Sequence, residues 1–407
     1  MGFQQGLSGL NAAAKSLDVI GNNIANASTV GFKQSQAQFA DVYASSLAGS
    51  GTGQAGIGVR VGTVAQQFTQ GNITTTNNSL DMAVSGSGFF RLSNNGSITF
   101  TRNGQFQLDR NGYIVNNQGY RLTGFLPNAA GVIVATAPAD IQISTADLLP
   151  NATTAITAGL NLNANSATIP AVPAFDPTNA ATFNNSTSAT VYDSLGGSHV
   201  ASLYFAKTGT NAWNAYLTVD GVNTQAANAP LTAMTFNTNG TLATPAAAVT
   251  STAFTPAGAA AQTLTIDFAS TSQFGTTFGV NSLSQDGFTS GHMTGFSTGA
   301  DGIISGRYSN GQTRTLGQVV LANFSNAQGL QPLGGNQWAE TSTSGTPLVG
   351  APGSASLGVL QTSAVEDSNV DLTAELVNMI TAQRVYQANA QTVKTQDQVL
   401  QTIVNLR

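Results

Sequence analysis

Two segments with helical periodicity, one at each end of the chain, constrain the fold more than any other feature. Between Asp371 and Leu406 the sequence contains neither Pro nor Gly, and apolar residues recur at alternating steps of four and three. This pattern predicts a helix about 54 Å long, with Asp371 as its N-cap and a heptad seam along one face. The seam consists of Leu372, Leu376, Met379, Gln383, Tyr386, Ala390, Val393, Asp397, Leu400 and Val404.

The start of the chain repeats the same spacing, in a row formed by Phe3, Leu7, Leu10, Ala14, Leu17, Gly21 and Ile24. A half-apolar helix needs a partner in water, so we expect the two terminal helices to pair and the middle of the chain to be looped out. The spacing fits a pair within one chain and a pair between subunits equally well. It also fits two helices that each cap a globular core.

The large apolar side chains of the two rows are the candidate assembly interface. Each contributes roughly 1.5–3 kcal/mol when it is fully buried, but only after a neighbour covers it. The candidates are Phe3, Leu7, Leu10, Leu17 and Ile24 near the N-terminus, and Leu372, Leu376, Met379, Tyr386, Val393, Leu400 and Val404 near the C-terminus.

Composition excludes several classes of partner. Only 8% of the residues are charged, the net charge is −5, and there is no cysteine. Such a chain has no basic surface for nucleic acid or anionic membranes, and it forms neither disulfides nor thiolate metal sites. We also expect no membrane insertion and no cleaved signal peptide, because long apolar runs and a secretory pattern are missing. The profile favours an extracellular assembly over a cytosolic enzyme.

Between the helices the hydrophobic period changes to two from Val59 onward, after a possible short helix around residues 39–47. The apolar runs are separated by turn dipeptides, which predicts antiparallel hairpins. These dipeptides are Asn95-Gly96, Asn103-Gly104, Asn111-Gly112, Gln118-Gly119, Asp220-Gly221, Asp301-Gly302 and Asn310-Gly311.

The predicted fold is therefore mainly β with α-helical termini, and its antiparallel β domains are nested. The expected divisions are a terminal helical domain (1–30 with 363–407), connecting segments (31–71 with 333–362), a core β domain (72–145 with 287–332) and an inserted β domain (146–286).

Two sequence matches to catalytic and cofactor-binding motifs lie in segments whose predicted secondary structure does not suit those motifs. The G-x-G-x-x-G match at residues 51–56 precedes a strand, whereas a dinucleotide site needs it between a strand and a helix. The G-x-S-x-G match at residues 295–299 lies in a hairpin pattern, and both histidines, His199 and His292, precede its serine. We predict no catalytic, cofactor or metal site and no enzymatic activity.

Several segments resemble the bacterial flagellar rod and hook family of axial proteins. The similar segments are residues 22–26, 29–33, 80–90, 101–106, 368–372, 375–377 and 382–390; they begin with Asn22-Asn23-Ile24-Ala25-Asn26 and end with Ala382-Gln383-Arg384-Val385-Tyr386-Gln387-Ala388-Asn389-Ala390. They lie at both ends and in the middle of the chain, in the order that the family shows.

Within that family, the chain length and the insert at 146–286 imply a structural subunit of the flagellar hook, a curved tube that acts as a universal joint between motor and filament. The resemblance implies a homo-polymer that meets rod proteins, a hook cap and hook–filament junction proteins, and export through the flagellar type III apparatus. A distal rod subunit is the alternative within the family. A secreted β-rich adhesin or binding module is the alternative outside it.

A tube with an export channel needs a lumen that a passing chain does not stick to. On the C-terminal helix a row of mostly neutral amides follows the four-three step on the face away from the seam, and we expect it to line that channel. The row consists of Gln387, Gln391, Lys394, Gln398 and Gln401. An ordinary solvated helix face would show the same pattern.

Overall fold

The computed structural model describes residues 2–42, 56, 58–128 and 131–405. The chain forms two compact units. We call the first the terminal unit; it comprises Met1–Ser144, Gly295–Arg307 and Thr313–Arg407. The second, the inserted unit, comprises Thr145–Thr294 with Tyr308–Gln312.

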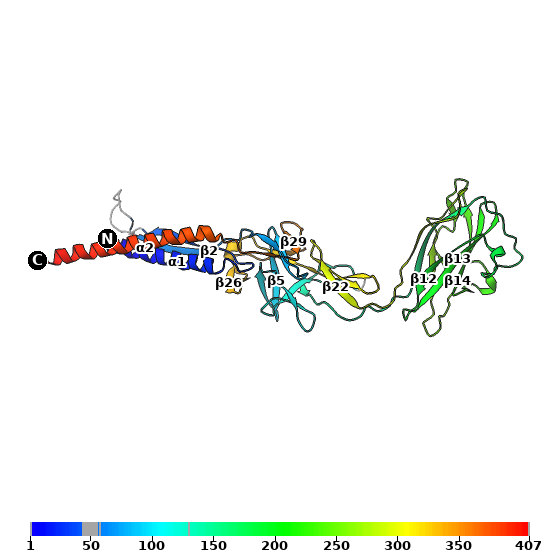
Figure 1. The fold of residues 1–407 in the computed structure, drawn as a ribbon, viewed down its shortest axis with the longest axis horizontal. Coiled ribbons are helices and arrows are strands. Elements are labelled where there is room, and N and C mark those ends of the chain that lie inside the picture. The colour runs from blue at the N-terminus through cyan, green and yellow to red at the C-terminus, as the bar shows by residue number, and fades with distance from the viewer. Residues whose placement is uncertain (1, 43–55, 57, 129–130, 406–407) are drawn as a thin grey trace. The chain divides into compact units, whose positions relative to one another are not determined.

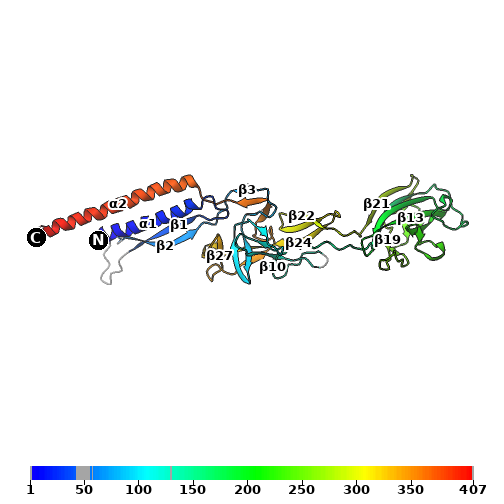
Figure 2. The same ribbon diagram turned by 60° about the horizontal axis from the view of Figure 1, so that its bottom comes forward.

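The two terminal helices pack side by side in the terminal unit. They are α1 (Gly2–Ala25) and α2 (Leu372–Asn405), and both chain ends lie at the same end of the pair (Figure 1 and Figure 2). The expectation that the ends pair is confirmed. Asp371 caps α2 as expected, because its Oδ1 accepts hydrogen bonds from the amides of Thr373 at 2.8 Å and Ala374 at 3.1 Å.

A β-hairpin of β1 (Ser35–Val42) and β2 (Gly58–Gln66) packs beside α1. The helix expected around residues 39–47 is therefore wrong for 39–42, and the rest of that range lies outside the described residues. Pairing with β2 overrides the local helical preference of this segment. Asn23 fixes the start of β1, since its side chain exchanges two hydrogen bonds with the backbone of Ser35, at 2.8 and 2.9 Å.

The β part of the terminal unit centres on a sheet of thirteen strands. Its members are β5 (Phe89–Asn94), β6 (Ser97–Thr101), β7 (Gln107–Leu108), β8 (Ile114–Val115), β9 (Arg121–Phe125), β10 (Ala139–Asp140), β22 (Met293–Thr298), β23 (Ile303–Tyr308), β24 (Thr313–Val319), β25 (Leu321–Asn323), β26 (Gln331–Gly334), β27 (Gln337–Ala339) and β28 (Leu348–Gly350). Edge-to-face aromatic contacts fill its core, with Phe89 against Phe324 and Trp338.

Two short antiparallel pairs join this sheet to the helices. They are β3 (Ile73–Thr75) with β30 (Ala364–Glu366), and β4 (Met82–Ser85) with β29 (Val359–Thr362). Each pair places a segment that follows α1 beside a segment that precedes α2. The chain therefore enters and leaves the β core along the same path.

Most of the expected turn dipeptides connect adjacent strands. Asn95 and Gly96, for example, adopt positive φ angles of 51° and 98° between β5 and β6. Asn103-Gly104 is the exception, because it does not close a hairpin. A Cβ on Gly104 would lie 1.6 Å from the carbonyl oxygen of Met82, so this glycine serves a close backbone approach.

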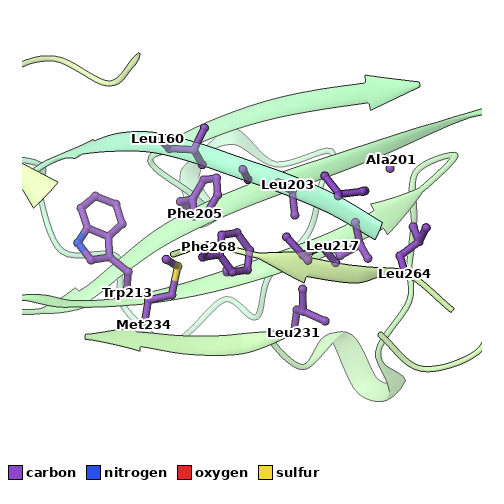
Figure 3. Close-up of a cluster of buried hydrophobic side chains, with 14 of the residues drawn as sticks. Leu160, Ala201, Leu203, Phe205, Trp213, Leu217, Leu231, Met234, Leu264 and Phe268 are labelled. Atoms are coloured by element: carbon purple, nitrogen blue, oxygen red, sulfur yellow. The ribbon is translucent and has the colours of Figure 1, made fainter. Parts of the chain in front are cut away.

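The inserted unit is a sandwich of two β-sheets. The first contains β11 (Ala155–Asn163), β18 (Val249–Thr250), β19 (Thr265–Asp267), β20 (Ser272–Phe274) and β21 (Gly279–Gln285). The second contains β12 (Asn185–Tyr192), β13 (Ser198–Gly209), β14 (Ala212–Val219), β15 (Val222–Asn223), β16 (Thr232–Phe236) and β17 (Leu242–Thr244). Alternate residues of facing strands, including Leu160, Phe205 and Leu217, form its core (Figure 3).

The described residues also form three short 3₁₀ helices, at Ala180–Thr182, Ala226–Asn228 and Ala327–Gly329. Two pairings depart from the expected antiparallel pattern, since β11 runs parallel to both β19 and β20. Between β11 and β19 the chain passes through the whole second sheet. That long connection permits a parallel neighbour, which a tight hairpin cannot supply.

Candidate assembly surfaces of the terminal helices

Small residues form the contact between α1 and α2. A Cβ on Gly6 would lie 3.0 Å from Val393 Cγ2, and a Cβ on Gly9 would lie 2.6 Å from Asn389 Oδ1. Ala13 is 5% exposed and continues the same row one turn later. The helices therefore approach closely through a row that is offset by one residue from the apolar row of the N-terminal segment.

This offset leaves much of the predicted interface uncovered in a single chain. On α1, Phe3 and Leu7 are exposed, whereas Leu10, Leu17 and Ile24 are half-buried. On α2, Met379 and Val393 are half-buried, and the exposed members are Leu372, Leu376, Tyr386, Leu400 and Val404. These side chains are available to a neighbour, so their role in assembly stays a prediction.

The uncovered residues at the end of α2 have a simple geometric cause. Gly6 lies opposite Val393, and α1 begins only four residues before Gly6. Leu400 and Val404 therefore lie beyond the start of α1, where no residue of that helix can cover them.

The predicted channel-lining residues are all exposed: Gln387, Gln391, Lys394, Gln398 and Gln401. At 100° per residue they lie on the side of α2 that faces away from α1. The same side is apolar about two to three turns earlier, where Val377 is 59% and Ile380 51% exposed. The amide character begins only after Arg384, a boundary that the sequence analysis missed.

Three buried charged side chains join the helices to the β core. Glu366 Oε1 accepts hydrogen bonds from Lys33 Nζ at 2.6 Å and from the Gly71 amide at 2.9 Å, and its Oε2 accepts one from Arg102 Nη1 at 3.2 Å. The side chains of Lys33 and Glu366 are 0% exposed and that of Arg102 is 4% exposed. We call these three residues the ion cluster.

The ion cluster contains two cations and one carboxylate, and all three side chains are shielded from water. Burial lowers the pKa of Lys33, and attraction to Glu366 opposes that shift. Backbone carbonyl oxygens also stabilise the two cations: Lys33 Nζ donates to Thr69 O at 2.8 Å, and Arg102 Nη2 donates to Gly86 O at 2.9 Å. Lys33 and Arg102 lie in segments that were noted in the sequence, but nothing in the sequence linked them to Glu366.

A groove of about 700 Å³ lies between α1, α2 and the β1–β2 hairpin. Its lining includes Ala12, Ser16 and Val19 of α1, Thr381 of α2 and Phe39 of β1. Glu375, in the first turn of α2, also lines this groove.

Glu375 is only 3% exposed, and its two carboxylate oxygens differ. Its Oε1 accepts a hydrogen bond from Gln34 Nε2 at 2.5 Å. Its Oε2 is buried and has no hydrogen-bond partner among the described residues. A desolvated carboxylate oxygen without a donor is costly, so the side chain of Glu375 is incompletely satisfied in the single chain.

A network of titratable side chains in the inserted unit surrounds His199. Its Nδ1 lies 2.6 Å from Asp220 Oδ2, and its Nε2 lies 3.3 Å from Asp193 Oδ2. The hydrogen bond to Asp220 raises the pKa of His199, and Asp193 adds to that shift. Because these residues come from the ends of β12, β13 and β14, the network ties two turns of one sheet together.

No catalytic arrangement emerges at the motifs that the sequence offered. Residues 295–298 of the G-x-S-x-G match lie in strand β22, not on a strand-to-helix turn. The G-x-G-x-x-G match lies outside the described residues except for Gly56. Across residues 2–42, 56, 58–128 and 131–405, no cluster of acidic and histidine side chains has the geometry to hold a metal ion. No helix in those ranges is long and apolar enough to cross a membrane.

Four family models match the chain in succession. They are described as flagella basal body rod protein (residues 3–33), flagellar hook protein FlgE/F/G D1 domain (83–169), flagellar basal body protein FlaE D2 domain (161–288) and flagellar basal body rod FlgEFG protein C-terminal (361–406). The family expected from the sequence motifs is confirmed.

Full-length relatives agree with these matches. The chain is 45% identical to the flagellar hook protein FlgE of Escherichia coli over 100% of both chains, and 31% identical to that of Borreliella burgdorferi over 99% and 98%. The crystal structure of Helicobacter pylori flagellar hook protein FlgE2 shares the fold, with a TM-score of 0.53 at 15% identity over 72% of this chain and 100% of that one. The chain therefore belongs to the flagellar hook protein FlgE family.

Proposed function

We propose that this chain is the structural subunit of a bacterial flagellar hook and polymerises into a curved tube that transmits torque from rod to filament. The full-length match to proteins named flagellar hook protein carries the proposal. It favours the hook over a distal rod subunit and over a secreted β-rich binding module. The half-covered apolar residues on α1 and α2 support it, because a single chain leaves them in water.

In this proposal the terminal helices of neighbouring copies pack together, and they use the apolar residues that one chain leaves uncovered. Phe3 and Leu7 of α1 and Leu400 and Val404 of α2 are the most direct candidates, since each is at least 44% exposed. The exposed amide face of α2, from Gln387 to Gln401, then lines the export channel. Neutral amides offer a passing chain neither apolar adhesion nor strong charge.

The same proposal assigns the division of labour along the chain. The helical domain (1–30 with 363–407) forms the inner wall, connecting segments (31–71 with 333–362) lead to the core β domain (72–145 with 287–332), and the inserted domain (146–286) makes weaker contacts between neighbours. Rod, cap and hook–filament junction proteins are the expected partners at the two ends of the tube. The subunit reaches the extracellular flagellum through type III export.

Electron microscopy of the concentrated purified protein tests this function. We expect curved tubes from the wild type and their loss in Leu7→Asp, because the substitution places a charge in the proposed interface. Val132→Asp is the control, since Val132 is 60% exposed and lies outside the helices. Straight tubes would favour a rod subunit, whereas a protein that stays monomeric at high concentration would favour a binding module.

A further inference from the structure

We propose that Glu375 is one half of an ion pair between subunits, and that the ammonium group of Lys15 from a second copy of this chain completes it inside the groove. The inference rests on the proposed function, because it needs copies that pack helix to helix. It assigns a specific partner to a carboxylate that has an oxygen without a hydrogen-bond donor in the single chain.

The first argument is the state of Glu375 itself. The side chain is nearly fully buried, yet its Oε2 meets no donor in the described chain, while its Oε1 is held by Gln34. A buried carboxylate normally receives several hydrogen bonds or a cation. The groove beside it, about 700 Å³, has room for the side chains of another helix.

The second argument is that the helix pair has two unlike sides. Groove-lining residues of α1, such as Ala12 and Ser16, lie roughly half a turn away from Phe3 and Leu7 when residues are placed at 100° intervals. One side of the pair is therefore a groove, and the other carries exposed apolar side chains. Two different complementary surfaces on one molecule produce a head-to-tail contact that repeats, as a helical tube requires.

The third argument selects the cation. The terminal helices carry three, Lys15, Arg384 and Lys394, and all three side chains are exposed. None of them forms an ion pair within the part of the chain that the structure describes. Arg384 and Lys394 lie on the far side of α2, which the proposed channel occupies. Lys15 remains. It is on the same helix as Phe3 and Leu7, and at 100° per residue it lies about 80° around the helix from Leu7, between their row and the groove-lining side.

Charge exchange tests this pairing. We expect Glu375→Lys and Lys15→Glu each to raise the critical concentration for tube formation about tenfold or more, and the double variant to recover most of the loss. Arg110→Glu is the matched control, because it reverses an exposed cation that lies outside the terminal helices, the groove and the proposed channel lining. Lys15 is exposed in the single chain, so its variant reports on assembly even where Glu375→Lys fails to fold.

Cross-linking locates the contact independently, since the chain has no native cysteine. Glu375→Cys and Lys15→Cys proteins are mixed, polymerised and treated with a short bismaleimide, which spans the separation that an ion pair between long side chains leaves. We expect a covalent dimer only in the mixture and only after polymerisation.

The outcomes separate the two proposals. Wild-type tubes combined with no rescue in the double variant, or with no cross-linked dimer, would overturn the Glu375–Lys15 pair and leave the hook function standing. Failure of the wild type to form any tube would overturn the proposed function itself.

Discussion

Replacing Glu366 by Gln is the sharpest test of how the helices are joined to the β core. The substitution keeps the shape of the side chain but removes the one negative charge of the ion cluster. Lys33 and Arg102 would then be two buried cations within reach of the same neutral amide. Removing one partner of a buried ion pair typically costs about 3–5 kcal/mol, because the other charge stays desolvated.

The comparison with Lys33→Met makes the prediction quantitative. That change removes a cation whose pKa burial already lowers, and it leaves Glu366 and Arg102 as a balanced pair. Its cost is the hydrogen bonds of Lys33 to Glu366 and Thr69, about 1–3 kcal/mol. Glu366→Gln should therefore be the more damaging variant by about 2 kcal/mol.

Urea unfolding of the full chain measures this difference. Trp338 is 2% exposed and reports on the terminal unit, and a Trp213→Phe background removes the signal of the inserted unit. At about 3 kcal/mol per molar urea, Glu366→Gln should lower the midpoint by roughly 1–2 M. A larger shift for Lys33→Met than for Glu366→Gln would refute the charge argument.

Three further predictions concern single features. Gly9→Leu should disrupt the α1–α2 contact and abolish tubes, whereas Gly21→Ala, whose Cβ would meet nothing within 4 Å, should be tolerated; electron microscopy of both variants checks this. Gln391→Leu with Gln398→Leu should leave hook assembly intact but stop filament growth in cells, and normal filaments would remove support for the channel lining. The pKa of His199 is raised in the folded state, so protonated His199 contributes to the free energy of unfolding. This contribution is complete below the usual pKa of 6.5 and is lost as pH rises through the higher folded value. Urea midpoints followed by Trp213 fluorescence should fall across that window in the wild type and stay flat in His199→Gln, with His292→Gln behaving like the wild type.

The sequence predicted the existence of the helix pair but not the row that forms it. Hydrophobic periodicity selects large residues such as Leu7, whereas two helices of one chain approach closest where side chains are smallest, at Gly6 and Gly9. Periodicity therefore identified side chains that the single chain leaves exposed or half-buried. The contact row was hidden because glycine carries no hydrophobic signal.

The ion cluster and the groove could not be predicted for a different reason. Lys33 and Glu366 are 333 positions apart, and neither lies in a local pattern that requires an opposite charge. The partner of a buried charge is set by tertiary packing, which periodicity and turn signals do not encode. The parallel neighbours of β11 escaped prediction for the same reason, because short-range patterns report hairpins only.

The paired segments between the helices and the β core have a mechanical consequence. A single strand linking two bodies lets one swivel against the other, because rotation about its φ and ψ angles meets little resistance. Here two antiparallel segments of the chain hydrogen-bond to each other through the β3–β30 and β4–β29 pairs, and the ion cluster links the same segments further. Rotating the helices against the core would have to shear or wind these paired segments, so the connection resists twisting.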